Sequence, residues 1–392
     1  MNMEKLGKYC KIISGYAFKS NDLSEGTEIP VIKIGNISNG NDVIIDSSTQ
    51  YVSSDFLSID EKYHIKKGDV LISLTGSHIN QPNSMVGRSC RNFSDTEFLL
   101  NQRAGKVIPN ENADKNYLYY LLNTESFKYS ICNRAYGAAN QANVSPSDIE
   151  NIKWNFPPLP TQQKIASILS AYDNLIQNYK KQIEALQTAA SELYKEWFVR
   201  FRFPGYQTAE FENGIPKGWK VEKVGDYCKV FTGKKDVNQT VEDGKYVFFS
   251  CSPDTFKSNE YIFDGKAILV AGNGSYTGRT RFFEGKFDLY QRTYAITTEK
   301  QDLIEYLYWV FKNDFESRYS GGTRGAAIPY IVLGDITKYK FLYSEEFVRK
   351  FVSYVIPINK KLDLLQQQIT NLIRQRDFLL PRLMSGKLEV KK

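Results

Sequence analysis

The sequence has little of what metal sites, disulfide scaffolds and membrane spans need. Of 392 residues, 2 are histidine and 5 are cysteine, and no two cysteines form a C-x-x-C pair. An odd number of scattered cysteines predicts reduced thiols, and the shortage of histidine argues against a zinc site. Apolar runs are short and broken by charges, whereas a bilayer span needs roughly 18 to 20 residues. With no secretory signal at the start, we expect a cytoplasmic protein without a cofactor.

The charge balance is mildly basic. The chain has 51 Lys+Arg against 44 Asp+Glu, which gives a formal net charge of +7. Such an excess suits an anionic partner without identifying it. The length predicts two or three domains, because a domain averages about 150 residues.

A duplication organises the whole chain. The segment from Lys5 to Gly15 reappears from Lys223 to Gly233, with six of eleven positions identical at an offset of 218. Shorter echoes follow, with Gly-Arg at 87 and 278, Gln-Arg at 102 and 291, and Asp-Ile at 148 and 335. This period is far longer than that of a solenoid, so the pattern predicts a duplicated domain. Each copy begins with short strands separated by Gly and Asn turns and ends in a helix.

Each copy closes with a long heptad helix. Its apolar residues alternate spacings of four and three, as in a coiled-coil seam, and this pattern favours two helices packed on each other over helices that each cover their own domain. Trp197 and Phe198 fit the seam better than a partner contact, and Pro357 predicts a kink or a late start in the second helix. Adding 186 to each position of the first stripe gives a second stripe that only Arg376 interrupts. The stripes are Ile165, Leu169, Tyr172, Ile176, Tyr179, Ile183, Leu186, Ala190, Leu193 and Trp197, then Phe351, Val355, Ile358, Leu362, Leu365, Ile369, Leu372, Arg376, Leu379 and Leu383.

The chain path predicts an antiparallel helix pair. The second strand-rich domain starts soon after the first helix ends, so the second helix must run back along the first. The predicted fold is α+β, with two strand-rich domains separated by two long antiparallel helices that form a coiled coil, and with a pseudo-two-fold internal repeat. A helix of about 37 residues measures about 55 Å, or at most about 16 base pairs of DNA. The expected segments are 1–157, 158–203 for the first helix, 204–217 for a linker, 218–343, and 344–392 for the second helix and tail.

This order of elements resembles the specificity subunits of type I restriction-modification systems. The likeness covers nearly the whole chain and rests on the two similar openings together with three motifs. These are Pro-Leu-Pro-Thr-Gln-Gln-Lys at 158–164, Glu-Trp-Phe-Val-Arg-Phe-Arg-Phe-Pro-Gly at 196–205 and Leu-Pro-Arg-Leu-Met-Ser-Gly-Lys-Leu at 380–388. The second helix departs from the pattern, because Leu-Tyr-Ser-Glu-Glu-Phe-Val at 342–348 replaces the Pro-Leu-Pro start.

The resemblance implies a division of labour. The regions 1–157 and 218–343 would be target recognition domains that each read one half of a bipartite asymmetric DNA site, and the helices would set the spacer. The implied partners are double-stranded DNA, two modification subunits that carry S-adenosylmethionine and methylate adenine, and restriction (translocase-nuclease) subunits, with no membrane. The chain itself would supply DNA recognition and a scaffold for the other subunits, and it would catalyse no reaction.

Four loops carry the amide, hydroxyl and guanidinium groups that read bases or hold phosphates. They lie at 75–91 and 133–141 in the first copy and at 272–281 and 320–325 in the second, and for any single residue an ordinary solvated loop is an equal alternative. The Gln-Arg pairs at 102 and 291 recur in both copies, so a phosphate or structural role suits them better than base choice. The candidate DNA contacts are Thr75, Ser77, His78, Asn80, Gln81, Arg88, Arg91, Arg134, Tyr136, Asn140, Gln141, Asn273, Ser275, Tyr276, Thr277, Arg279, Arg281, Thr323 and Arg324.

Two other functions stay open at this point. Asp254 with Asp264 and Lys266 fits the loose carboxylate-carboxylate-lysine pattern of a metal-dependent nuclease. The first copy has Lys-Gly-Asp at 67–69 in the equivalent place, which is typical of a turn that leads into a strand. A non-catalytic coiled-coil scaffold is the second alternative. An adenine methyltransferase is disfavoured, because Asn155-Phe-Pro-Pro-Leu places its aromatic residue before the prolines.

Overall fold

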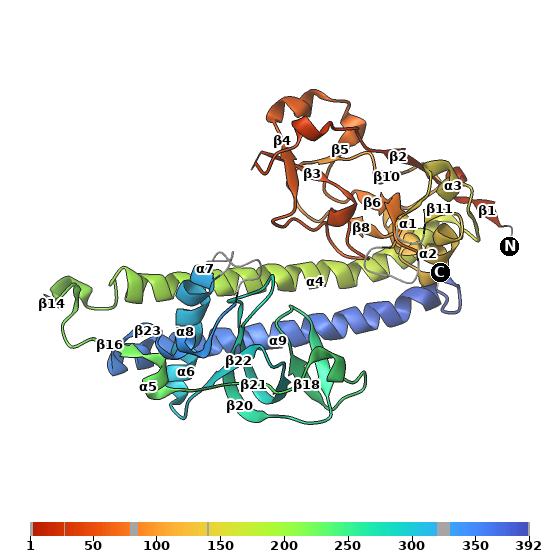
Figure 1. Cartoon of the computed structure of the whole chain (residues 1–392). Coiled ribbons are helices and arrows are strands. Elements are labelled where there is room, and N and C mark those ends of the chain that lie inside the picture. The colour runs from red at the N-terminus through yellow and green to blue at the C-terminus, as the bar shows by residue number, and fades with distance from the viewer. Residues whose placement is uncertain (1–2, 27, 79–84, 139–140, 320–329, 391–392) are drawn as a thin grey trace. The chain divides into compact units, whose positions relative to one another are not determined.

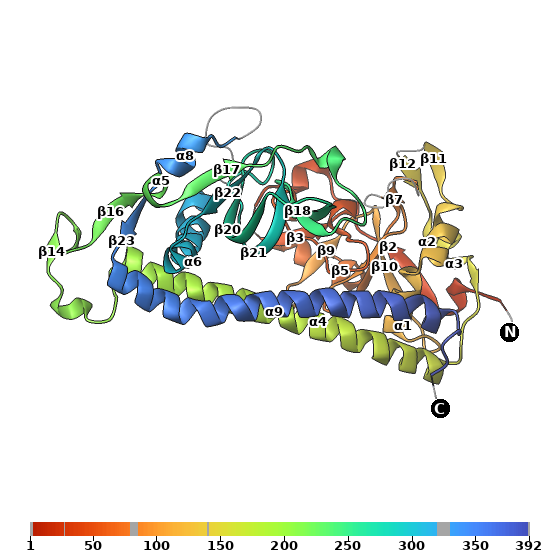
Figure 2. The same ribbon diagram turned by 90° about the horizontal axis from the view of Figure 1, so that it is seen from below.

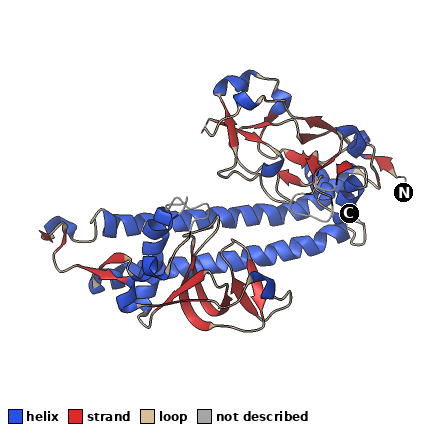
Figure 3. Cartoon of the chain, viewed as in Figure 1, coloured by secondary structure: helices blue, strands red, loops and turns tan. Residues whose placement is uncertain are grey.

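The computed structural model divides the chain into two compact units. The first contains residues 1–178 and 369–392, and the second contains residues 179–368. Each unit therefore holds one strand-rich region and one half of each long helix (Figure 3). The described residues are 3–26, 28–78, 85–138, 141–319 and 330–390, without the side chains of 138 and 141.

Two four-stranded sheets dominate the first unit. Side chains alternate along β6, so that Val70 and Ile72 face a core shared with the helices, whereas Leu71 faces a core shared with the other sheet. The sheet that contains β6 is thus covered on both faces. Its strand order is β2 (Cys10–Ser14), β10 (Ala104–Pro109), β6 (Val70–Ser73), β8 (Ser89–Arg91), and the other order is β4 (Gln50–Val52), β3 (Ile29–Ile32), β9 (Phe98–Leu100), β5 (His64–Ile65). Smaller sheets and helices are β11 (Tyr136–Ala138), β12 (Gln141–Asn143) and β7 (Thr75–Gly76); β1 (Glu4–Lys5) and β13 (Lys153–Trp154); α1 (Lys115–Leu122), α2 (Glu125–Cys132) and α3 (Pro146–Glu150).

One six-stranded sheet dominates the second unit. Ile268 and Val270 on β20 face the helical core, while Ala267 and Leu269 face a second, smaller core. The strand order is β17 (Lys229–Thr232), β22 (Thr293–Thr297), β20 (Phe263–Ala271), β21 (Thr280–Leu289), β18 (Tyr246–Phe249), β19 (Thr255–Ser258). The remaining elements are β14 (Phe211–Glu212) with β15 (Ile215–Pro216), β16 (Lys220–Lys223) with β23 (Lys340–Tyr343), α5 (Val224–Tyr227), α6 (Gln301–Val310), α7 (Glu316–Tyr319) and α8 (Leu333–Thr337).

The strand order confirms the internal repeat. The run β2-β10-β6-β8 of the first unit has the same order and the same antiparallel pairing as β17-β22-β20-β21 of the second. In both units a parallel neighbour follows, because β3 pairs with β9 and β18 pairs with the end of β21. The long strand β21 of the second unit therefore occupies the positions that two separate strands, β8 and β9, occupy in the first unit.

A glycine shared by the two openings has a steric reason. A Cβ at Gly15 would lie 2.3 Å from the carbonyl oxygen of Leu100, and a Cβ at Gly233 would lie 1.8 Å from that of Leu289. Both carbonyls are at the ends of equivalent strands, β9 and β21. Only glycine permits this close approach of two backbones.

The two long helices confirm the heptad prediction. They are α4 (Leu159–Tyr194), which continues as a π-helical turn (Lys195–Val199), and α9 (Glu345–Met384). All twenty stripe positions are buried or partly buried. In the first unit the opening half of α4 contacts the closing half of α9, and in the second unit the end of α4 contacts the start of α9 (Figures 1 and 2). The helices are therefore antiparallel, as predicted.

The ends of both stripes also join the globular cores. Ile165, Leu169 and Leu383 belong to the main core of the first unit, so helix pairing and domain packing occur together rather than as alternatives. Trp197 and Phe198 are buried seam residues whose rings contact Phe351. Of the two alternatives expected at Pro357, a kink or a late start, the late start is wrong, because α9 begins at Glu345 and runs unbroken through position 357.

Candidate nucleic-acid interface

The structure brings two of the predicted loops of the first unit together. β7 pairs with β12, and the Thr75 hydroxyl donates to Asn143 Oδ1 at 2.8 Å. Arg103, from the repeated Gln-Arg pair, is exposed and donates to the same Asn143 oxygen at 3.5 Å. Tyr136, on the adjoining strand β11, is 62% exposed. An exposed aromatic ring thus lies on this small sheet, and an exposed guanidinium contacts the sheet through Asn143.

The second unit has exposed aromatic and basic side chains in and beside its loop at 272–281. Asn273 forms an antiparallel bridge with Tyr330, and the Ile331 amide donates to the Gly272 carbonyl at 2.8 Å. Tyr276 and Tyr330 are 46% and 47% exposed, and Ser275 and Arg292 are exposed as well. Aromatic rings that stand free of the core are suited to stack on bases, and exposed guanidiniums to hold phosphates.

Several predicted contacts are buried instead. Arg91 is 4% exposed, and it donates to Asn116 Oδ1 at 2.7 Å and to Asp173 Oδ2 at 3.2 Å. Arg88 is also buried, and it donates to the carbonyl of Ile34 at 2.9 Å. Guanidiniums engaged in this way stabilise the fold and have no free donor face for DNA. The buried hydroxyl residues, which we likewise leave out of the interface, are Thr75, Ser77 and Thr277.

Arg279 and Arg281 belong to the loop at 272–281, and both are half-buried. Arg281 donates to the carbonyl oxygens of Ser252, at 2.8 Å, and Pro253. Burial lowers the pKa of Arg281 to about 10 and also lowers the pKa of Arg279. Arg279 Nη1 is buried without a hydrogen-bond partner among the described residues, and both side chains line a cavity of about 10 Å³, enough for one water molecule. The two hydrogen bonds tie Arg281 to the backbone of the neighbouring loop.

The other predicted contacts fall into two groups. His78 and Asn273 are partly exposed, and Arg134 is exposed and donates to the carbonyl of Asn151 at 3.4 Å. The predicted contacts that lie outside the described residues are Asn80, Gln81, Asn140, Thr323 and Arg324, together with the side chain of Gln141.

The sequence interpretation missed two residues of this surface, Asn143 and Tyr330. Asn143 lies two residues beyond the predicted loop at 133–141, and Tyr330 lies five residues beyond the loop at 320–325; the two are related by an offset of 187, close to the offsets of the other echoes. Extending the self-comparison past Gln141 would have found them. The Asn143 side chain accepts from Thr75, and the Tyr330 backbone forms a bridge with that of Asn273.

The carboxylates of the nuclease pattern do not converge. Lys266 donates to the buried Glu305 at 2.6 Å, whereas Asp264 lies opposite Lys286 on the neighbouring strand. Asp254 is exposed on a separate loop. Within the described ranges, no group of three or more His, Cys, Asp or Glu side chains could hold a metal ion, and no described helix has the length and apolar content of a membrane span.

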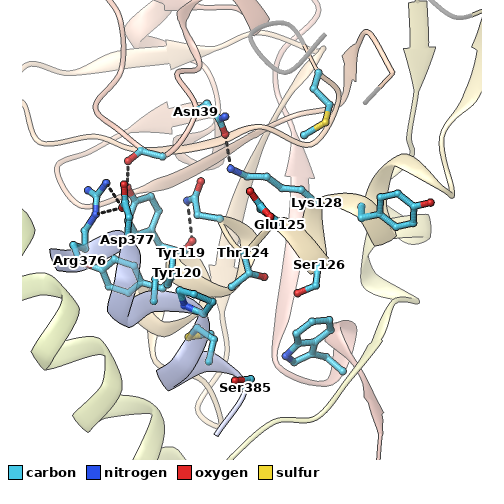
Figure 4. A pocket seen from close by; sticks show the side chains of 18 residues that line it. Asn39, Tyr119, Tyr120, Thr124, Glu125, Ser126, Lys128, Arg376, Asp377 and Ser385 are labelled. Atoms are coloured by element: carbon cyan, nitrogen blue, oxygen red, sulfur yellow. Dashed lines mark hydrogen bonds and ion pairs between the residues drawn. The ribbon is translucent and has the colours of Figure 1, made fainter. Parts of the chain in front are cut away.

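A cavity of about 980 Å³ lies between α1, α2 and the closing turns of α9 in the first unit (Figure 4). Tyr119, Tyr120 and Trp154 supply aromatic walls, and Lys128 donates to Asn39 Oδ1 at its edge. Burial lowers the pKa of Lys128 to about 8. The wall is mixed in polarity and contains no cluster of acids or bases that would define a reaction centre.

Comparison with known proteins agrees with this architecture. The family model for the type I restriction modification DNA specificity domain matches twice, at residues 1–188 and 216–343. The chain is 28% identical over 320 residues to the type I restriction enzyme MjaIX specificity subunit of Methanocaldococcus jannaschii, across 75% of this chain and 73% of that protein. It is 42% identical over 125 residues to the EcoDI specificity subunit of Escherichia coli, across 31% of this chain and 27% of that protein.

A solved structure shares the fold. The S subunit of a type I restriction-modification system from M. genitalium superposes with a TM-score of 0.60 at 18% sequence identity, covering 98% of this chain and 96% of that one. Two matches to one domain model are what the internal repeat requires; the first includes most of α4, and the second ends just before α9. The chain therefore belongs to the type I restriction modification DNA specificity family.

Proposed function

We propose that this chain is the specificity subunit of a type I restriction-modification complex and reads a bipartite DNA target with two loop surfaces. The first surface contains Tyr136, Arg134 and Arg103, and the second contains Tyr276 and Arg292. The observation that carries the proposal is the recurrence of one pair of exposed groups. Each unit has an exposed tyrosine in a predicted loop and the exposed arginine of a Gln-Arg pair close by: β7 pairs with β12 in the first unit, and the Gly272 amide donates to the Arg292 carbonyl in the second.

The two kinds of residue have different tasks. Arg103 and Arg292 occupy equivalent positions in the two copies, so they suit phosphates, which are the same in every sequence. Tyr136 and Tyr276 lie in loops that differ between the copies. Two half-sites of different sequence need different readers, so we assign base selection to these loops.

The alternatives have less support. The carboxylates of the nuclease pattern are separated, and a plain scaffold would not need two surfaces that each carry an exposed tyrosine and an exposed arginine. The further partners that we propose are two modification subunits, which supply methylation of adenine, and restriction subunits. Because the proposed partner is the cell's own DNA, we also propose that the chain acts in the cytoplasm.

Alanine variants of the complex test the assignment of each half-site. Tyr136→Ala should relax base selectivity in one half of the target, and Tyr276→Ala should relax it in the other half. Binding to a library of DNA duplexes, in which each position of the two-part target is varied, measures this selectivity. Tyr129→Ala is the matched control, because Tyr129 is 54% exposed but belongs to α2 rather than to a loop surface. If both loop variants retain the selectivity of the control at every position, the assignment fails.

A further inference from the structure

Arg376 interrupts the apolar stripe of α9, and the structure supplies its partner. Arg376 Nη1 donates to Asp173 Oδ1 on α4 at 2.7 Å, and Asp173 is only 3% exposed. The other oxygen of Asp173 accepts from the Tyr120 hydroxyl at 2.6 Å and from Arg91 at 3.2 Å. Burial lowers the pKa of Arg376, but the attraction and hydrogen bond of Asp173 outweigh burial, so this pKa lies above its usual value. One buried carboxylate thus joins α9, α1 and β8 to α4.

The second unit has no such charge pair at the equivalent positions. The offset of 186 carries Asp173 to Asn359 and Arg376 to Ala190, and both equivalents are buried. Asn359 Nδ2 donates to Glu305 Oε2 at 2.7 Å, while its Oδ1 has no hydrogen-bond partner among the described residues. The Asp-Arg pair therefore marks one of two otherwise similar junctions.

Similar stripes create an alternative pairing with a second copy of the chain. Because α4 and α9 share one heptad phase, α4 of one copy can pack on α4 of another copy, and α9 can pack on α9. In the α4 pair, Ala190 of the second copy would lie opposite Asp173. In the α9 pair, Arg376 would lie opposite Asn359 of the second copy. The carboxylate would lose its α9 cation, and a largely buried guanidinium would face a neutral amide, which is costly.

We propose that Asp173 and Arg376 form a pairing key: their ion pair favours the packing of α4 on α9 of the same chain and disfavours the packing of α4 on α4, or of α9 on α9, between two copies. Polar residues at single seam positions specify partners in coiled coils at some cost in stability. The key concerns assembly of the chain alone, so it stands or falls independently of the DNA target.

Two opposite variants of the full chain test the key. Asp173→Asn with Arg376→Ala gives the first junction the residues of the second. Ala190→Arg with Asn359→Asp gives the second junction a charge pair like that of the first, with Glu305→Gln added because Glu305 accepts from Asn359 and would repel an aspartate there. Each variant makes the two junctions alike. After unfolding and refolding at high concentration, light scattering should therefore show a larger fraction of dimer, with twice the 45.0 kDa chain mass, than in the wild type. Arg376→Lys retains the charge and is the matched control, with the wild-type dimer fraction.

The paired design separates a pairing key from simple loss of stability. Loss of stability would raise the dimer fraction in the variant without charges only, whereas a pairing key requires a rise in both. The proposal is overturned if the variant with two charge pairs folds and keeps the dimer fraction of Arg376→Lys. If that variant does not fold, an unchanged dimer fraction in the variant without charges overturns it.

Discussion

Replacing Asp173 by asparagine is predicted to destabilise the first unit strongly. The carboxylate accepts from three donors, and the side chains of Arg91 and Arg376 are only 5% and 14% exposed. Asparagine has nearly the same size but no charge, so both guanidiniums would remain buried without their shared counter-charge. Removing one partner of a buried ion pair costs about 3–5 kcal/mol, and we expect this range for the free energy of unfolding.

Urea unfolding at pH 7, followed by far-ultraviolet circular dichroism, measures this loss. Hydrogen exchange of α1 and of the closing turns of α9 shows whether the loss falls on the first unit, as expected. Asp377→Asn is the matched control, since Asp377 is largely exposed and pairs with Arg376 at 2.8 Å. An exposed pair contributes about 0–1 kcal/mol. A loss in Asp173→Asn no larger than that of the control would refute the importance given to this carboxylate.

Three further predictions concern the interface, a titrating lysine and a steric constraint. Arg103→Ala and Arg292→Ala should each lower the salt dependence of DNA binding by about one phosphate contact, measured as the slope of log affinity against log salt, with an unchanged motif. Lys128→Met should raise the unfolding free energy at pH 7 by about 1–2 kcal/mol. Because the Lys128 pKa of about 8 lies below its unfolded value, wild-type stability should rise with pH through the interval between the two, and the gap between the two urea midpoints should shrink there. Gly233→Ala should cost about 1–3 kcal/mol through overpacking, whereas Gly334→Ala, with open space at its Cβ, should be nearly neutral in thermal unfolding.

The repeat and the helices could be predicted because both are periodic in sequence. An offset that is constant over eleven residues, and a stripe that keeps one spacing through ten positions, leave few other architectures. Position 357 misled the prediction of the helix start, because proline disfavours a helix interior, but the residues before it form a complete helix. Packing of Phe351 and Val355 in the core of the second unit offsets the local cost of the proline.

The roles of single polar residues could not be predicted in the same way. Arg91 has the composition of a DNA contact and is instead part of a buried network, because its partner Asp173 lies 82 residues away. Arg376 was recognised as an exception to its stripe, but its partner is 203 residues distant and lies beside the seam position Tyr172. Long-range contacts of this kind follow from the fold and leave no periodic signal in the sequence.

The proposed function requires that two loop surfaces, one in each unit, each read one half of the DNA target. Mapping methylated adenines in DNA from cells that express this chain with its modification subunits tests that claim most directly. The account predicts one asymmetric motif in two specific parts, with a fixed gap of unspecified bases between them. A continuous motif, or methylated sites whose gap varies freely, would contradict it.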